Sequence, residues 1–270
     1  MADGWKVVHM KIVITAPFAA QQVEELKGQH EVLFSPQDDS TPLRSEEQLH
    51  SLLAEERAEI FITESDRVTA QVLEGLDDLK LLCVCRTGLN NIDIPACTDH
   101  GVALVNAPGR NAAAVADMVM ALFIDMSRFL FEGEKLLRSG QWDEGIYYRL
   151  RGHELYGNTV ATIGFGAIPK ELAKRISGFG MKMIAYDPYV SAEIMASYGV
   201  EKVTLEEAFS GGDYVTLHLP VTEQTRHMVN RDLLKLMKPS AYFVNAARSA
   251  IVVEEDVLEL LEKHRIAGAR

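Results

Sequence analysis

Residues 159–169 read Thr-Val-Ala-Thr-Ile-Gly-Phe-Gly-Ala-Ile-Pro, and this stretch decides the fold. Its first five residues predict a buried strand, and residues 168–178 predict a helix. The turn between them carries Gly164 and Gly166, the first two glycines of the G-x-G-x-x-G pattern, in the strand–turn–helix context that the pattern requires. The stretch therefore predicts the phosphate-binding turn of a dinucleotide-binding fold.

Each residue of this turn has a separate physical task. Gly164 permits the tight turn, and Gly166 lets a diphosphate approach the backbone without meeting a Cβ. The amides of Ala167 and Ile168, together with the helix dipole, attract the phosphate groups. Pro169 stands where the third glycine would be, and the first helical turn tolerates it because its missing N–H has no helical partner there. We therefore expect the turn to bind coenzyme in spite of the proline.

An acidic residue ends the next predicted strand, residues 182–186. The carboxylate of Asp187 can accept hydrogen bonds from the adenosine ribose hydroxyls, and it repels a 2′-phosphate. This favours NAD over NADP as the cofactor. A glycine turn without any ligand remains the alternative interpretation.

The same alternation of short apolar strands and helices extends over the rest of the chain. On the N-terminal side it predicts strands at 11–15, 30–34, 59–63, 79–85 and 103–106, and helices at 21–27 and from Ser45 onward. On the C-terminal side it predicts strands at 214–219 and 242–246, and helices at 112–139, 191–197, 230–237 and 254–264. Strands of this composition, separated by helices, are typical of parallel sheets covered on both faces. We therefore expect an α/β protein with two parallel-sheet domains, residues 1–107 and 108–270.

Composition excludes several classes of partner. Lys and Arg total 27 and Asp and Glu total 39, so the net charge is −12, which disfavours nucleic acid and anionic membranes. The apolar stretch 115–126 contains two aspartates and is too short to span a bilayer. The Cys83 and Cys85 spacing is not that of a zinc site, so we expect no metal. Free thiols and no apparent signal segment favour the cytoplasm.

Five separated motifs resemble those of the D-isomer-specific 2-hydroxyacid dehydrogenases. They are Arg-Thr-Gly-Leu-Asn-Asn-Ile-Asp at 86–93, Asn-Ala-Pro-Gly-Arg-Asn at 106–111, Asp-Pro-Tyr at 187–189, His-Leu-Pro-Val-Thr at 218–222 and Asn-Ala-Ala-Arg-Ser at 245–249. The resemblance implies a flavodoxin-like substrate domain followed by a Rossmann NAD-binding domain. It further implies reversible hydride transfer between a D-2-hydroxyacid and NAD+, which gives a 2-oxoacid and NADH.

The same resemblance assigns roles to individual residues. It implies that Arg248 is the catalytic arginine, which holds the substrate carboxylate and polarises the carbonyl group. It also implies a homodimer formed through the helix at 112–139. Arg86 and Arg110 could meet a second anionic group, as in 3-phosphoglycerate, or could be surface charges. The further candidates are Arg86, Thr87, Gly88 and Leu89 for substrate, and Leu219, Pro220, Thr225, Ala246 and Ala247 for coenzyme.

The family's general acid/base is a histidine with a carboxylate partner, and both follow the segment that would continue residues 266–269. The sequence given ends at Arg270, and none of its 8 histidines matches that position, so we name no catalytic base. We expect the NAD-binding domain to lack its last strands, which would leave the strand at 242–246 as a sheet edge. Two functions stay open: an NAD-dependent oxidoreductase, and a non-catalytic NAD(H)-binding protein that senses redox state or binds partners.

Overall fold

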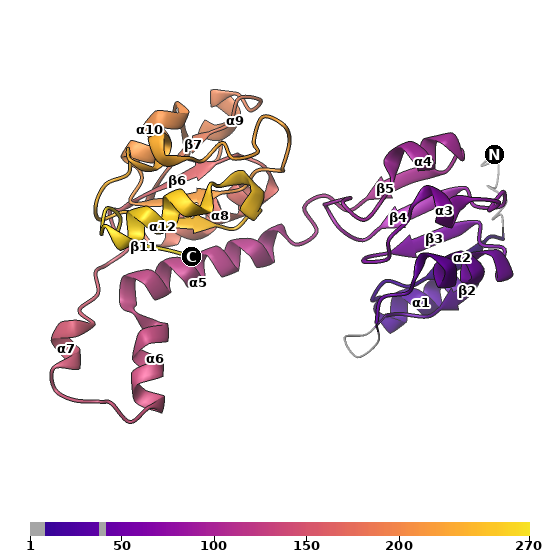
Figure 1. Ribbon diagram of the computed structural model, residues 1–270, viewed down its shortest axis with the longest axis horizontal. Coiled ribbons are helices and arrows are strands. Elements are labelled where there is room, and N and C mark those ends of the chain that lie inside the picture. Colours follow the sequence, from indigo (N-terminus) through magenta and orange to yellow (C-terminus); the bar gives the residue numbers. More distant parts are fainter. Residues whose placement is uncertain (1–8, 38–41) are drawn as a thin grey trace, which may run out of the picture. The chain divides into compact units, whose positions relative to one another are not determined.

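The computed structural model describes residues 9–37 and 42–270, and the chain forms two compact units, Met1–Arg110 and Asn111–Arg270 (Figure 1). Each unit is built on a parallel sheet that carries helices, which confirms the expected fold class. Each of the four hydrophobic clusters takes its residues from one unit only. Both units therefore have a core of their own.

The first unit has a five-stranded sheet in the order β2-β1-β3-β4-β5, the flavodoxin-like order. Its strands are β1 Lys11–Ile14, β2 Glu31–Phe34, β3 Ile60–Thr63, β4 Leu81–Val84 and β5 Ala103–Asn106. Its helices are α1 Ala20–Lys27, α2 Glu46–Glu55, α3 Ala70–Leu73 and α4 Ile94–Asp99. Ser45 caps α2 as expected, because its side chain accepts a hydrogen bond from the backbone amide of Gln48. The predicted strands of this unit are confirmed, whereas the short α3 and α4 had no clear signal.

The second unit has a six-stranded sheet in the order β11-β10-β9-β6-β7-β8, which is that of a doubly wound dinucleotide-binding domain. Its strands are β6 Thr159–Ile163, β7 Lys182–Tyr186, β8 Glu201–Lys202, β9 Tyr214–Leu217, β10 Tyr242–Asn245 and β11 Gly268–Ala269. Its helices are α5 Ala112–Arg128, α6 Leu130–Arg138, α7 Ile146–Arg149, α8 Ala167–Gly178, α9 Ala192–Ala196, α10 Leu205–Gly211, α11 Arg231–Leu234, the 3-10 turn Ser249–Ile251 and α12 Glu254–Glu262. The strand order reverses between β6 and β9, and open α/β sheets bind ligands at such a point.

The single helix expected at 112–139 is wrong, because the chain breaks it at Phe129. Phe129 has a left-handed backbone, with φ 54°, and separates α5 from α6. The buried Asp125 gives the physical reason, because its Oδ1 accepts a hydrogen bond (2.8 Å) from the amide of Phe131 and so starts a new helix. Apolar spacing continues across the break, so periodicity alone predicts one helix.

The expectation that the strand at 242–246 would be a sheet edge is also wrong. β11 pairs in parallel with β10, with Tyr242 opposite Gly268 and Phe243 opposite Ala269. A strand of two residues carries too little pattern to be predicted, and β8 was missed for the same reason. The predicted helix at 230–237 is a single turn, α11, because only Arg231–Leu234 stay helical.

Among the described residues, no helix combines the length and the apolarity that a membrane crossing requires. Cys97 is buried, Cys83 and Cys85 are half-buried, and all three are free thiols. Burial raises the pKa of each thiol, which lowers its reactivity near neutral pH.

Candidate functional site

The turn between β6 and α8 requires glycine at its first position. Gly164 has φ 96°, and its N–H donates to the carbonyl of Tyr186 at 2.7 Å. A Cβ on Gly164 would lie 2.5 Å from the carbonyl oxygen of His218 and 2.9 Å from Leu219 Cδ2. The absence of a side chain therefore lets β6 and the segment after β9 approach each other at the switch point.

The turn presents unpaired donors at the start of α8. Gly166 and Ala167 are exposed, and a Cβ on Gly166 would meet nothing within 4 Å. Within residues 9–37 and 42–270, no acceptor reaches the N–H groups of Gly166, Ala167 and Ile168. Pro169 is buried within the first turn of α8 and does not break the helix. These donors and the dipole of a 12-residue helix suit a diphosphate.

Asp187 lies beside this turn, as the sequence predicts, and it is 9% exposed. Its Oδ2 accepts from the amide of Phe165 at 2.8 Å. Its Oδ1 accepts from the amides of Tyr189 at 2.8 Å and Val190 at 3.2 Å. The carboxylate therefore joins the phosphate turn to the end of β7, a role that sequence reasoning missed.

A cleft of about 530 Å³ opens beside Asp187 at the end of β7. Three of the residues that line it are acidic, Asp187, Glu206 and Glu207, and one is basic. The basic residue, Lys202, donates to the carbonyl of Val190 at 2.7 Å. The predominance of acidic residues disfavours an additional phosphate in this cleft. Lys202 was missed because it lies on β8, which is too short to be predicted.

The segment after β9 reaches the same edge of the sheet. Leu219 is next to Gly164, as the distance to an added Cβ shows. Thr225 folds the segment back, because its hydroxyl donates to the carbonyl of Pro220 at 2.6 Å. Ala246 and Ala247 directly follow β10, the neighbour of β9, so they lie at the same carboxyl edge. The coenzyme candidates thus gather at one edge of one sheet.

His218 lies at the same edge of the sheet, and its imidazole is uncharged at neutral pH. Its Nε2 is 3.1 Å from the hydroxyl of Thr216, and its Nδ1 is buried with no partner among the described residues. Burial lowers the pKa of His218 to about 4, so the imidazole is neutral at pH 7. His218 therefore makes a local hydrogen bond to Thr216 and is uncharged at neutral pH.

His218 predicts a pH dependence of stability. Because its pKa falls from 6.5 in the unfolded chain to about 4 in the folded one, the unfolded state binds the proton more tightly. The folded state therefore loses stability as pH falls from 6.5 towards 4, by about 3 kcal/mol for this group. Urea unfolding should show that His218→Gln removes this part of the slope. His100→Gln, at an exposed position, is the control, and an equal change in both variants would contradict the assignment.

Arg248 is exposed and follows β10. Its Nη1 donates to the carbonyl of Ala247 at 2.8 Å, and no carboxylate of the described residues pairs with it. Asn245 holds the backbone on both sides, because its Nδ2 donates to the carbonyl of Arg248 (3.0 Å) and its Oδ1 accepts from the amide of Ala247 (3.0 Å). Arg248 therefore forms no surface ion pair with the described residues, and its charge is available to bind an anion.

The predicted substrate residues lie in the other unit, on the loop after β4. The N–H groups of Thr87, Gly88 and Leu89 meet no acceptor within the part of the chain that the structure describes. Consecutive unpaired amides form a concavity that suits a carboxylate. Arg86 is half-buried beside them, and no ion pair with it is found among the described residues. Arg110 differs, because its Nη2 pairs with Glu64 at 2.6 Å, and this reduces the charge it can offer to a second anionic group.

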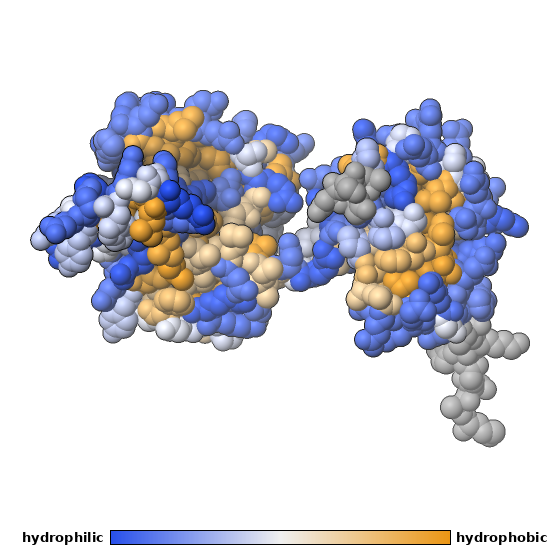
Figure 2. Space-filling view, turned by 90° about the horizontal axis from the view of Figure 1, so that it is seen from below, coloured by the Kyte–Doolittle hydropathy of each residue, from blue (hydrophilic) through white to orange (hydrophobic). Residues whose placement is uncertain are grey.

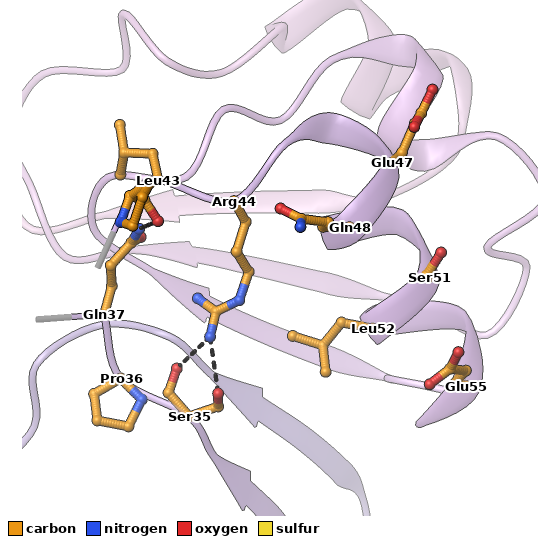
Figure 3. A pocket seen from close by; sticks show the side chains of 11 residues that line it. Ser35, Pro36, Gln37, Leu43, Arg44, Glu47, Gln48, Ser51, Leu52 and Glu55 are labelled. Atoms are coloured by element: carbon orange, nitrogen blue, oxygen red, sulfur yellow. Dashed lines mark hydrogen bonds between the residues drawn. The ribbon is translucent and has the colours of Figure 1, made fainter.

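A separate hollow of about 910 Å³ lies between α2 and the segment after β2 (Figure 3). The guanidinium of Arg44 turns onto Ser35, where Nη2 donates to the carbonyl at 2.9 Å and to the hydroxyl at 2.8 Å. The buried Asp66, 3.9 Å from Nη1, opposes its charge. We assign no ligand to this hollow. Among residues 9–37 and 42–270, no group of three or more His, Cys, Asp or Glu side chains could hold a metal ion.

The comparisons with known proteins agree with this geometry. The model of the family "D-isomer specific 2-hydroxyacid dehydrogenase, NAD binding domain" matches residues 120–270, and the chain belongs to this family. The chain is 36% identical over 264 residues to the YoaD protein of Bacillus subtilis. The matched region covers 96% of this chain and 76% of that protein. It is 35% identical over 262 residues to the D-3-phosphoglycerate dehydrogenase of Methanocaldococcus jannaschii. This match covers 96% of this chain and 48% of that enzyme. The structure of apo D-lactate dehydrogenase from Escherichia coli matches with a TM-score of 0.77 and 28% identity, over 96% of this chain and 81% of that one.

These findings confirm the expected family, fold class and cofactor. The class is that of NAD-dependent oxidoreductases, and the turn, the acidic cleft and the unpaired amides fit an NAD molecule. The alternative of a non-catalytic sensor is not favoured, because the relatives named for an activity are dehydrogenases and reductases.

Proposed function

We propose that the chain uses NAD for the reversible oxidation of a small D-2-hydroxyacid to the corresponding 2-oxoacid. One observation carries the proposal: three unpaired amides open α8 beside a carboxylate and an acidic cleft. The amides of Gly166, Ala167 and Ile168 would hold NAD+, which would supply the acceptor for the hydride from C2 of the hydroxyacid, and the hydroxyl proton would pass to solvent water as the carbonyl forms. The site residues of this chain bind and orient the two reactants.

The two predicted domains, 1–107 and 108–270, divide this work. The amides of Thr87, Gly88 and Leu89 hold the substrate carboxylate in the first domain. The second domain supplies the coenzyme turn and Arg248, whose planar fork of donors suits the oxygens of a 2-oxoacid. Of the substrates that the relatives' names suggest, 3-phosphoglycerate is supported by the unpaired Arg86 and less by Arg110, which is paired with Glu64.

A titration with NADH tests the proposal. We expect saturable enhancement of nicotinamide fluorescence, with NADPH at least about tenfold weaker because the acidic cleft repels its extra phosphate. Glyoxylate, hydroxypyruvate and 3-phosphohydroxypyruvate are then added in turn, and oxidation of NADH is followed by absorbance. No change in fluorescence at millimolar NADH would contradict coenzyme binding. Binding without oxidation of NADH by any of the three oxoacids would contradict the hydride transfer.

We infer that the chain forms a homodimer through the arm of α6 and α7. Helix α6 buries none of its residues, and the arm projects from the rest of its unit (Figure 1). Figure 2, seen from the side on which the arm hangs in Figure 1, shows apolar atoms on this part of the surface. The exposed apolar side chains of the arm are Leu130, Phe131, Leu137, Trp142, Tyr147 and Tyr148, each more than half exposed. A second copy of the chain would cover such a patch, and gel filtration that shows only monomer at micromolar concentration would contradict this.

The remaining partner and location proposals follow from charge and chemistry. A net charge of −12 argues against nucleic acid and membrane surfaces as partners. Three free thiols support a reducing compartment, and we propose the cytoplasm. Fluorescence microscopy of the tagged protein tests this, and an extracellular signal would contradict it.

A further inference from the structure

The loop after β4 is fixed on one side by Asn106, the last residue of β5, and by Ala107, which follows it. Asn106 donates its side-chain Nδ2 to the carbonyl of Thr87 at 2.9 Å. The hydroxyl of Thr87 donates to the carbonyl of Ala107 at 3.3 Å, and the amide of Ala107 donates to the carbonyl of Arg86 at 3.1 Å. Three hydrogen bonds thus hold the start of the loop, and all of them leave the N–H of Thr87 free.

The other end of the loop is fixed by the segment after β3. Asn91 donates its Nδ2 to the carbonyl of Asp66 at 2.7 Å, and the amide of Val68 donates to the carbonyl of Asn91 at 2.9 Å. Asp66 is a rigid anchor, because it is 2% exposed and its Oδ2 accepts from the hydroxyls of Thr15 at 2.5 Å and Thr63 at 2.6 Å. The Oδ1 of Asn91 has no partner among the described residues, so this side chain contributes through its donor alone.

We propose that Asn91 and Asn106 are positioning residues that hold the amides of Thr87, Gly88 and Leu89 in one arrangement for the substrate carboxylate. The proposal rests on the substrate role given to this loop above. Asn106 donates to the carbonyl of Thr87 at the start of the loop, and Asn91, at the other end, donates to the carbonyl of Asp66 outside the loop. Losing either donor removes one of the hydrogen bonds that hold that end of the loop, so a larger part of the ordering entropy has to be lost when the carboxylate binds.

Asp substitutions test this, because aspartate has the shape of asparagine and lacks its donor. The probe is oxamate, an unreactive analogue of a 2-oxoacid, titrated calorimetrically into the full chain saturated with NADH. Asn90→Asp is the matched control, since Asn90 is the exposed neighbour of Asn91 and its side chain makes no hydrogen bond within the described residues. The control adds the same charge as either variant, and it adds it to the loop that carries Asn91 and that Asn106 contacts.

We expect Asn91→Asp and Asn106→Asp each to bind oxamate about tenfold more weakly than Asn90→Asp does. NADH affinity should stay within about twofold of wild type, because the coenzyme residues lie in the other unit. Asn106→Asp, at an exposed position, keeps the test valid if the substitution of the half-buried Asn91 disturbs folding. Equal oxamate affinity in all three variants would overturn the positioning role alone. Failure of the wild-type NADH complex to bind oxamate would overturn the substrate role of the loop and the positioning role with it.

Discussion

Gly166→Ala is expected to weaken NADH binding at least about 30-fold while the free energy of unfolding changes by less than about 1 kcal/mol. The ligand-free chain has room for the added methyl group, since a Cβ at this position meets nothing within 4 Å and φ is −85°. The methyl group would instead occupy the space through which a diphosphate reaches the amides of Ala167 and Ile168. Fluorescence titration with NADH and urea unfolding of the ligand-free protein measure the two effects.

Gly164→Ala provides the contrast. Its Cβ would lie 2.5 Å from a backbone oxygen, that of His218, and φ 96° is strained for any residue with a side chain. We expect it to lower the free energy of unfolding of the ligand-free protein by about 3 kcal/mol or more. Normal NADH affinity in Gly166→Ala would disprove the phosphate role of the turn, whatever happens to Gly164→Ala.

Arg248→Ala is expected to lower the affinity of the NADH complex for oxamate by about 100-fold or more, and to lower any kcat/KM for a 2-oxoacid by at least as much. The guanidinium has no carboxylate partner among the described residues, and Asn245 fixes the backbone that carries it. Loss of the side chain therefore removes a charge-assisted hydrogen bond to the ligand, in addition to the exposed internal bond to the carbonyl of Ala247. Calorimetry with oxamate and initial rates of NADH oxidation measure the effect.

Two further variants test whether the loss of oxamate affinity is specific to the guanidinium group of Arg248. Arg248→Lys keeps the charge and loses the planar fork, so we expect it to recover only a small part of the affinity. Arg265→Ala removes an exposed arginine that follows α12 in the same unit, and it should bind oxamate as wild type does. If Arg248→Ala also matches wild type, the catalytic assignment is wrong.

The fold was largely predictable because both sheets are parallel and buried. Strands such as β5, β6 and β7 were predicted at their observed bounds. Short runs of Val, Ile and Ala that end at turn residues indicate both that a strand forms and where it begins and ends. Most of the elements that were missed or shortened are short: β8, β11, α3 and α11 span four residues or fewer, and α4 and α10 span six and seven, so none carries a usable period. The break at Phe129 depends on a tertiary hydrogen bond from Phe131 to the buried Asp125, which periodicity cannot show.

The candidate site was predictable where backbone geometry demands one residue type. Gly164 is needed at a positive φ against a carbonyl, so the motif and the structure agree for a physical reason. Asp187 was predicted from its place after a strand, but its bond to Phe165 joins segments 22 residues apart and is visible only in three dimensions. The same is true of the pairing of Arg110 with Glu64, which are 46 residues apart.

The separate cores of the two units affect how substitutions can accumulate in such a protein during evolution. No buried cluster mixes side chains from both units, so a substitution in the core of the first unit leaves the core packing of the second unit unchanged. Substitutions that accumulate in one unit during evolution therefore need no compensating change in the core of the other.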